Sequence, residues 1–251
     1  MGNKVKRERL YLLDSIRGFA LINMIAYHAL YDVVYIFGHP IAWYESEIGY
    51  IWQQSICWCF ILLSGACFSL GKHPVKRGAT IFAMGCLISI ITALVMPQQR
   101  VRFGILSFIG IAMIITQLLV PLLKKIPPFA GLLGSLFLFL MTKLVPTGAL
   151  GIGDYPLILL PTALYQNKFL YPLGFPYSGF FSSDYFSLIP WIFLYWTGVY
   201  LSFCGKKLLS SKVFYQKIPP FHWVGQYSLW IYMVHQPVVY GALLVLHTIS
   251  K

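Results

Sequence analysis

The chain alternates long apolar stretches with short segments rich in charged residues, glycine and proline. Seven stretches are long enough to be membrane-spanning helices, because a crossing needs ~20 residues at ~1.5 Å rise per residue. The predicted spans are residues 11–37, 48–70, 79–96, 103–123, 129–145, 185–203 and 221–246. The pattern therefore predicts an all-α, multi-pass transmembrane helix bundle of about seven spans, forming a single domain over residues 1–251.

The segment between the fifth and sixth spans differs from the rest of the chain. Residues 147–184 contain four prolines, several glycines and many aromatic residues, and their most apolar piece, 157–164, is too short to cross a bilayer. We expect a long, ordered loop on the outer face that binds a substrate or covers a site, as loops of this length commonly do.

Charge distribution indicates the orientation of the spans. Only 10% of the residues are charged, against ~25% in a typical soluble domain, and the formal net charge is +12. The basic residues lie mainly in loops, which the positive-inside rule explains better than nucleic-acid binding does. We therefore expect a plasma-membrane protein whose N-terminus is cytoplasmic. Its expected partner is the lipid bilayer, and no nucleic-acid partner is expected.

The first predicted span carries four ionisable residues, Asp14, Arg17, His28 and Asp32. They fall within about 60° of one another on a helical wheel. A charged residue in a span costs at least ~2.5–3.5 kcal/mol on insertion scales, so these side chains need partners or a wet cavity. The spacing predicts pairing of Asp14 with Arg17 and of His28 with Asp32, the latter suiting a general base. A purely structural role between helices is the alternative.

The last predicted span carries a second polar group of residues. Ser228, Tyr232 and His235 fall on one face, and Pro237 follows two residues after the histidine. A proline inside a helix frees a carbonyl one turn earlier, and polar clusters at such points often line a cavity. His235 and Tyr232 are therefore candidates for the same site as His28, with a structural contact between helices as the alternative.

Other polar residues are candidates for binding. Lys76 and Arg77 lie in the basic segment 72–77, and Arg100 and Arg102 lie in a loop expected on the outer side, where the positive-inside rule does not require them. His39 follows the first span. No metal site is predicted, because the histidines have no convergent third ligand and the five cysteines resemble small buried hydrophobic residues.

Four short motifs give the chain a family resemblance. They are LDSIRG at 13–18 with MIAYHALYD at 24–32, FGIL at 103–106, DYFSLIPW at 184–191 and GQYSLWIYMVHQP at 225–237. In this order they resemble the bacterial relatives of heparan-alpha-glucosaminide N-acetyltransferase, a family of membrane acyltransferases. The resemblance covers nearly the whole chain. The family often has a histidine just after the FGIL motif, where this chain has Ser107.

The resemblance implies transfer of an acetyl group from cytoplasmic acetyl-CoA, a co-substrate, to a saccharide amine or hydroxyl at the outer face. Asp14, Arg17, Lys76 and Arg77 would then serve the polyanionic CoA. His28 oriented by Asp32 would act as base, and Tyr232 or His235 would stabilise the oxyanion. The lysosomal enzyme has its catalytic histidine in the loop after the first span, so His39 is a further catalytic candidate.

The predicted acceptor site lies on the outer side. The resemblance implies that Arg100, Arg102, Asp184 and Trp191 border a saccharide there. Two other function classes compete with the transferase. A proton-coupled transporter or permease would use the same buried Asp and His residues as a relay, and a non-catalytic membrane subunit would tolerate isosteric changes in the first span. The sequence is compatible with a homo-oligomer and names no particular acceptor.

Overall fold

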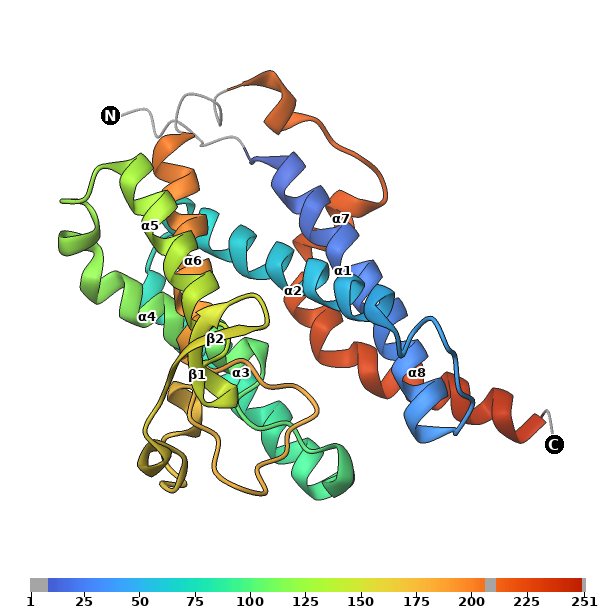
Figure 1. Cartoon of the computed structure of the whole chain (residues 1–251). Helices are drawn as coiled ribbons and strands as arrows, with labels where there is room; N and C mark the ends of the chain where they lie inside the picture. The colour runs from blue at the N-terminus through green and yellow to red at the C-terminus, as the bar shows by residue number, and fades with distance from the viewer. Residues whose placement is uncertain (1–8, 206–210, 250–251) are drawn as a thin grey trace. The chain divides into compact units, whose positions relative to one another are not determined.

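The computed structural model describes residues 9–205 and 211–249, and this part of the chain is mostly helical (Figure 1). The basic N-terminal residues and the lysines at 206–207 lie outside the described residues. The elements are α1 Tyr11–Tyr31, α2 Glu47–Ala66, α3 Pro74–Val95, α4 Ile105–Leu123, α5 Pro128–Thr142, β1 Ala149–Ile152, β2 Tyr155–Leu159, α6 Leu188–Cys204, α7 Phe221–Gln226 and α8 Ser228–Ile249.

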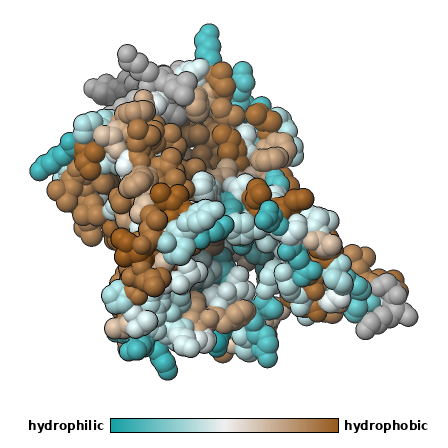
Figure 2. Space-filling model, in the orientation of Figure 1, coloured by the Kyte–Doolittle hydropathy of each residue, from teal (hydrophilic) through white to brown (hydrophobic). Residues whose placement is uncertain are grey.

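The helices have the length and composition of membrane spans. Within the described ranges, six helical segments are long and apolar enough to cross a bilayer, and α6 is a shorter apolar helix. Large apolar side chains such as Phe129, Leu133 and Leu118 are exposed to the surroundings. Figure 2 shows hydrophobic residues predominating over α4 and α5. These observations confirm an all-α, multi-pass membrane bundle, while the number of spans and their orientation stay predictions.

Two helix boundaries differ from the sequence-based expectation. Helix α3 begins at Pro74, so Lys76 and Arg77 lie in its first turn rather than in a loop. Proline is well suited to this position because its fixed φ matches the helix and its missing N–H needs no partner there. The predicted last span is interrupted at Tyr227, which has φ −99° and ψ 16°, and is thereby divided into α7 and α8.

The residues group into two compact units, which are described separately. The terminal unit comprises residues up to Phe60 together with those from 206 onward, and the central unit comprises Ile61–Gly205. Helix α2 contributes its first part to the terminal unit and its last turns to the central unit. The prediction of one domain over the whole chain is not tested by this grouping.

The terminal unit is built by close packing of α1 against α7. A Cβ placed on Gly18 would lie 1.9 Å from the carbonyl oxygen of Phe221, and one on Gly225 would lie 1.8 Å from that of Asp14. The two backbones therefore touch, and only glycine fits at either position. Leu21, Met24 and Ile56 form a buried apolar cluster beside this contact. This packing fixes the position of the polar face of α1.

Small residues hold the helices of the central unit together in the same way. Gly78 on α3 packs against Gly110 on α4, and Gly65 near the end of α2 packs against the Tyr195 carbonyl on α6. Between α5 and α6, the Ser135 and Thr197 hydroxyls form a hydrogen bond of 3.0 Å. Interfaces of small residues and interhelical hydrogen bonds are typical of helix packing in membranes.

The segment between α5 and α6 contains no helix of spanning length. It forms the antiparallel β1–β2 hairpin, paired from Ala149 with Leu159 to Ile152 with Tyr155, followed by short 3₁₀ turns. Gly153 lies in the hairpin turn with φ +61°, a conformation that favours glycine. The sequence predicted an ordered loop here but gave no indication of the hairpin.

Candidate functional site

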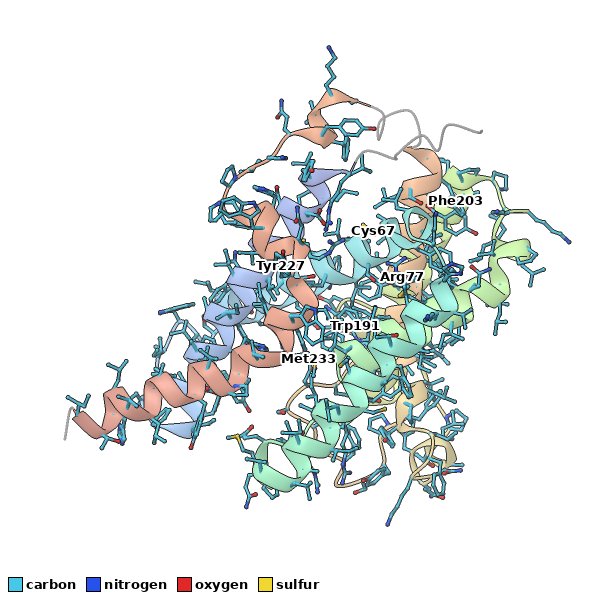
Figure 3. The ribbon with its side chains drawn as sticks, turned by 180° about the vertical axis from the view of Figure 1, so that it is seen from behind. Cys67, Arg77, Trp191, Phe203, Tyr227 and Met233 are labelled. Atoms are coloured by element: carbon cyan, nitrogen blue, oxygen red, sulfur yellow. The ribbon has the colours of Figure 1, made fainter. Side chains whose placement is uncertain are left out.

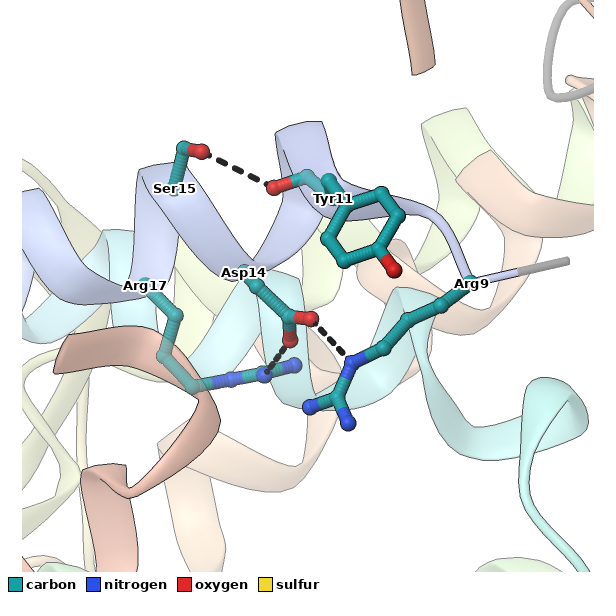
Figure 4. Close-up of polar contacts among 5 residues, drawn as sticks. All are labelled: Arg9, Tyr11, Asp14, Ser15 and Arg17. Atoms are coloured by element: carbon teal, nitrogen blue, oxygen red, sulfur yellow. Dashed lines mark hydrogen bonds and ion pairs between the residues drawn. The ribbon is translucent and has the colours of Figure 1, made fainter. Parts of the chain in front are cut away.

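The start of α1 holds a network of ion pairs. The Asp14 carboxylate accepts a hydrogen bond from Nη1 of Arg17 at 2.8 Å and another from Nε of Arg9 at 2.6 Å (Figure 4). Asp14 is buried, whereas Arg9 is exposed. The predicted pairing of Asp14 with Arg17 is therefore confirmed, and Arg9 is an additional partner that was not expected.

Two histidines from the opposite ends of the sequence meet in the terminal unit. The rings of His28 on α1 and His235 on α8 have their centroids 5.2 Å apart. Nδ1 of His235 lies 2.6 Å from the Tyr232 carbonyl oxygen, so this nitrogen carries the proton and donates. In the neutral ring, Nε2 then has a lone pair, and this atom is buried and has no hydrogen-bond partner. Such a nitrogen is suited to accept a proton.

Asp32 pairs with Gln236 rather than with His28. Nε2 of Gln236 donates to both carboxylate oxygens, at 2.8 and 2.9 Å, and Asp32 is fully buried. The predicted hydrogen bond between His28 and Asp32 is therefore wrong. Helical periodicity predicts that these two side chains lie near each other in a regular α-helix. In the structure the α-helix ends at Tyr31 and a π-helical turn begins at Asp32, which directs the carboxylate toward α8.

Tyr232 lies beside the histidine pair. Its ring centroid is 5.3 Å from that of His235, and its carbonyl oxygen accepts the His235 proton. The sequence also offered His235 as a donor to an oxyanion. The neutral ring in this arrangement presents an acceptor at Nε2, which makes Tyr232 the better candidate for that role.

His39 belongs to a different group of residues. Its ring contacts that of His247 at 6.0 Å, near the end of α8. His235 and His247 are twelve residues apart on this helix, or about 18 Å at 1.5 Å per residue. The structure therefore does not bring His39 together with the pair formed by His28 and His235.

Burial keeps Tyr44, in the loop between α1 and α2, in its neutral form. The Tyr44 hydroxyl donates to the Tyr27 carbonyl oxygen at 3.2 Å, and Tyr44 itself is buried. Desolvation raises the pKa of Tyr44 above its usual range, since burial disfavours the phenolate. The hydroxyl thus remains a donor at any physiological pH and ties the loop after α1 back to the helix.

In the central unit, Arg102 is surrounded by aromatic residues. Its guanidinium donates to the Tyr177 hydroxyl and lies 5.9 Å from the centre of the Phe180 ring. Nε of Arg100 is buried without a hydrogen-bond partner. Phe180 also packs against Tyr185, whose pKa burial raises to about 12. Arg102 therefore lies among the aromatic residues of the segment between α5 and α6, and Arg100 is joined to the same segment through its carbonyl oxygen, which accepts a hydrogen bond from the Ser183 N–H.

Asp184 has a structural role at the start of α4. Its carboxylate accepts a hydrogen bond of 3.1 Å from the backbone N–H of Ile105, and negative charge at a helix N-terminus is favourable. A Cβ on Gly104 would lie 2.4 Å from this carboxylate. Phe103, next to this glycine, has φ +55°. The FGIL and DYFSLIPW motifs therefore meet at one point, where the glycine makes room for the aspartate.

The other binding candidates of this unit are dispersed. Trp191 packs against Phe139 and Phe186, with ring centroids 5.5 and 5.0 Å away. Lys76 is exposed. Arg77 is partly buried, and its guanidinium lies against the backbone of Gly71. Trp191 is therefore part of an aromatic cluster, while Arg77 differs from its neighbour Lys76 in reaching the interior.

Sequence analysis missed two residues that the structure singles out. Gln236 holds Asp32, and its position next to His235 in the last motif was the available signal. Tyr195 is a fully buried tyrosine in the middle of α6, and no local pattern distinguishes it from the other aromatic residues there. Across the described ranges, no group of three or more His, Cys, Asp or Glu residues is arranged to hold a metal ion.

Comparison with known proteins adds the family. Residues 9–237 match the family model described as heparan-alpha-glucosaminide N-acetyltransferase, catalytic. No curated protein and no solved structure matches the chain. The matched range contains the ion pairs of Asp14, both histidines of the ring pair and the contact of Asp184 with α4. The match covers most of the chain, and the chain therefore belongs to the heparan-alpha-glucosaminide N-acetyltransferase catalytic-domain family, a family of membrane transferases.

Proposed function

We propose that the chain is an acetyl-CoA-dependent transmembrane acetyltransferase of the plasma membrane that acetylates a saccharide amine or hydroxyl at the outer face. The observation that carries this proposal is the buried Nε2 of His235, an unpaired acceptor beside the ring of His28. The family supports the reaction class. A homo-oligomer remains a prediction.

In this mechanism His235 is the general base. The acceptor amine or hydroxyl attacks the thioester carbonyl carbon while Nε2 of His235 takes its proton. A C–N or C–O bond forms, the C–S bond breaks, and the proton passes to the sulfur of the departing CoA. General base catalysis by a positioned imidazole contributes typically ~10²–10⁴-fold to the rate. His28 packs against this ring and restricts its orientation.

Two further groups support the reacting residues. Tyr232 donates to the oxyanion that develops on the thioester carbonyl, an interaction that strengthens in the transition state. Asp32 and Gln236 join α1 to α8 next to His235 and so act as positioning residues. On the donor side Arg17 attracts phosphate groups, although Asp14 neutralises part of its charge. That Arg100 and Arg102 border a saccharide stays a prediction from the family resemblance.

The test is acetyl transfer by the purified protein in detergent, with labelled acetyl-CoA and a panel of amino sugars and oligosaccharides. Release of free CoA thiol and labelling of the acceptor should rise together. We expect His235→Gln and His28→Gln to lower the rate by at least ~10²-fold, while His39→Ala retains it. Loss of transfer in His39→Ala alone would move the chemistry to the loop after α1 and overturn the assignment.

A proton-coupled transporter is the second candidate. His28 and the buried residues His235 and Asp32 lie in one unit and could relay protons as well as serve a transferase. Reconstituted vesicles distinguish the two. Solute flux driven by a pH gradient, without consumption of acetyl-CoA, would favour the transporter, whereas acetylation without flux would exclude it.

A further inference from the structure

The central unit contains a partly buried cation that is paired with no carboxylate among the described residues. Arg77 lies in the first turn of α3 (Figure 3). Its Nη1 atom is buried without a hydrogen-bond partner. Residues 61–205 include only two acidic side chains, Asp154 and Asp184. Asp154 is exposed in the hairpin turn, and Asp184 binds the start of α4. No described ion pair involves Arg77.

Helix packing keeps Asp184 away from this arginine. Ser107 on α4 packs against Gly85, which lies eight residues beyond Arg77 on α3, or about 12 Å along the helix. The contact between Asp184 and Ile105 lies further in the same direction. Nη1 of Arg77 is therefore a buried donor without an acceptor among the described residues of this unit, and leaving a buried donor unpaired is unfavourable.

A second unpaired donor faces the same place. The Tyr195 hydroxyl on α6 is fully buried and makes no hydrogen bond of acceptable geometry, and the side chains of Ser64 and Arg77 are its polar neighbours. The ring is held in place by Phe68, at 6.5 Å between centroids, and by backbone packing of α6 against Gly65. Two buried donors from different helices, Nη1 of Arg77 and the Tyr195 hydroxyl, therefore lie near each other.

Gly71 makes room for the guanidinium. A Cβ on Gly71 would lie 1.8 Å from Nη1 of Arg77, although the φ of −92° and ψ of 155° suit any residue. The glycine is therefore required by the arginine and not by the backbone. In addition, the N-terminal turn of α3 carries free N–H groups and a positive dipole end, which favour an anion at this point.

We infer that Arg77 and Tyr195 form a binding site for one phosphate group. A guanidinium offers paired N–H donors that match two phosphate oxygens, and the phenol O–H fits a third. The phosphate has two sources, a phosphate of a soluble ligand such as CoA or the headgroup of an anionic lipid. The link to CoA rests on the proposed acetyltransferase function, whereas the phosphate site itself does not.

Binding experiments test this site without any transfer reaction. The purified full chain in detergent is titrated with pyrophosphate and with CoA, and the dissociation constants are measured by thermal shift. In parallel, the protein is placed in nanodiscs of phosphatidylcholine with or without phosphatidylglycerol, and retained lipid is measured by mass spectrometry after extraction. Saturable binding of pyrophosphate identifies a soluble ligand, and selective retention of phosphatidylglycerol identifies a lipid.

Three variants change the site in different ways. Arg77→Gln removes the cation, Tyr195→Phe removes only the hydroxyl, and Gly71→Ala displaces the guanidinium without changing any charge. We expect each to weaken binding at least tenfold for whichever probe the wild type binds. Lys125→Gln removes an exposed cation of the same unit that belongs to no proposed site, and it should leave binding within twofold of wild type. Gly71→Ala keeps the test valid if Arg77→Gln fails to fold.

The outcomes separate this inference from the proposed function. Wild-type protein that binds neither probe, or variants that all bind like wild type, would overturn the phosphate site. Acetyl transfer absent while Arg77-dependent phosphate binding is present would reject the transferase alone. Transfer present without any effect of Gly71→Ala or Tyr195→Phe on binding would reject the phosphate site alone.

Discussion

Replacing Gly18 with alanine tests the backbone contact between α1 and α7. The new Cβ would lie 1.9 Å from the Phe221 carbonyl oxygen, whereas an ordinary contact begins at 3.4 Å, so the helices would have to separate by about 1.5 Å. The Phe221 carbonyl oxygen is a backbone atom, so it cannot move aside by a side-chain rotation. Overpacking of this kind costs typically ~1–3 kcal/mol.

The assay is thermal unfolding of the purified protein in one detergent. For a chain of this size 1 kcal/mol corresponds to ~2–4 °C, so Gly18→Ala should lower Tm by about 2–12 °C. Gly241→Ala is the matched control, because a Cβ at that position on α8 would meet no side chain and no other helix within 4 Å. There alanine should be neutral or stabilising by up to ~1 kcal/mol through helix propensity.

The change in Tm should therefore be negative for Gly18→Ala and zero or positive for Gly241→Ala. A Gly18→Ala protein that unfolds at the same temperature as Gly241→Ala would show that α1 and α7 do not pack backbone to backbone. The position of the polar face of α1 would then be wrong as well, because the same contact fixes it.

Three other predictions concern single side chains. Gln236→Leu leaves the buried Asp32 carboxylate without the two hydrogen bonds from Gln236 and should cost ~1.5–3 kcal/mol, and the double variant with Asp32→Asn should recover most of the decrease in Tm. Asp184→Ala removes the acceptor at the start of α4 and should cost ~1–2 kcal/mol in the same assay, with an unchanged Tm as the contrary result. Tyr185 has its pKa raised to about 12 by burial, so the folded protein keeps a proton that the unfolded chain loses near pH 10. Stability should fall as the pH rises from 10 to 12, and Tyr185→Phe should lessen that fall; equal slopes in both proteins would contradict it.

Features that depend on neighbours along the chain were predictable. Long apolar stretches predicted the membrane helices, and three-residue spacing predicted the ion pair between Asp14 and Arg17. Both follow from a regular helix, whose geometry is known before the fold is. The same rule failed for Asp32, because the helix changes to a π-helical turn at this residue and its partner lies on α8.

Features that depend on distant segments needed the structure. The sequence placed Asp184 at an acceptor site because of its motif, yet the carboxylate holds the start of α4, seventy-nine residues earlier in the chain. It also treated Lys76 and Arg77 as one basic segment. Only packing against Gly71 and the proximity of Tyr195 distinguish the second cation from the first.

The sequence by itself determined the membrane class, the approximate helix boundaries and the set of polar residues in apolar surroundings, because water-to-lipid transfer and helix periodicity are local properties. The tertiary structure decided which polar residues become partners: His28 with His235, Asp32 with Gln236, and Arg77 near Tyr195. The physical reason is that a buried polar group must find whichever donor or acceptor the packed helices bring to it, and that choice is made across segments far apart in the chain.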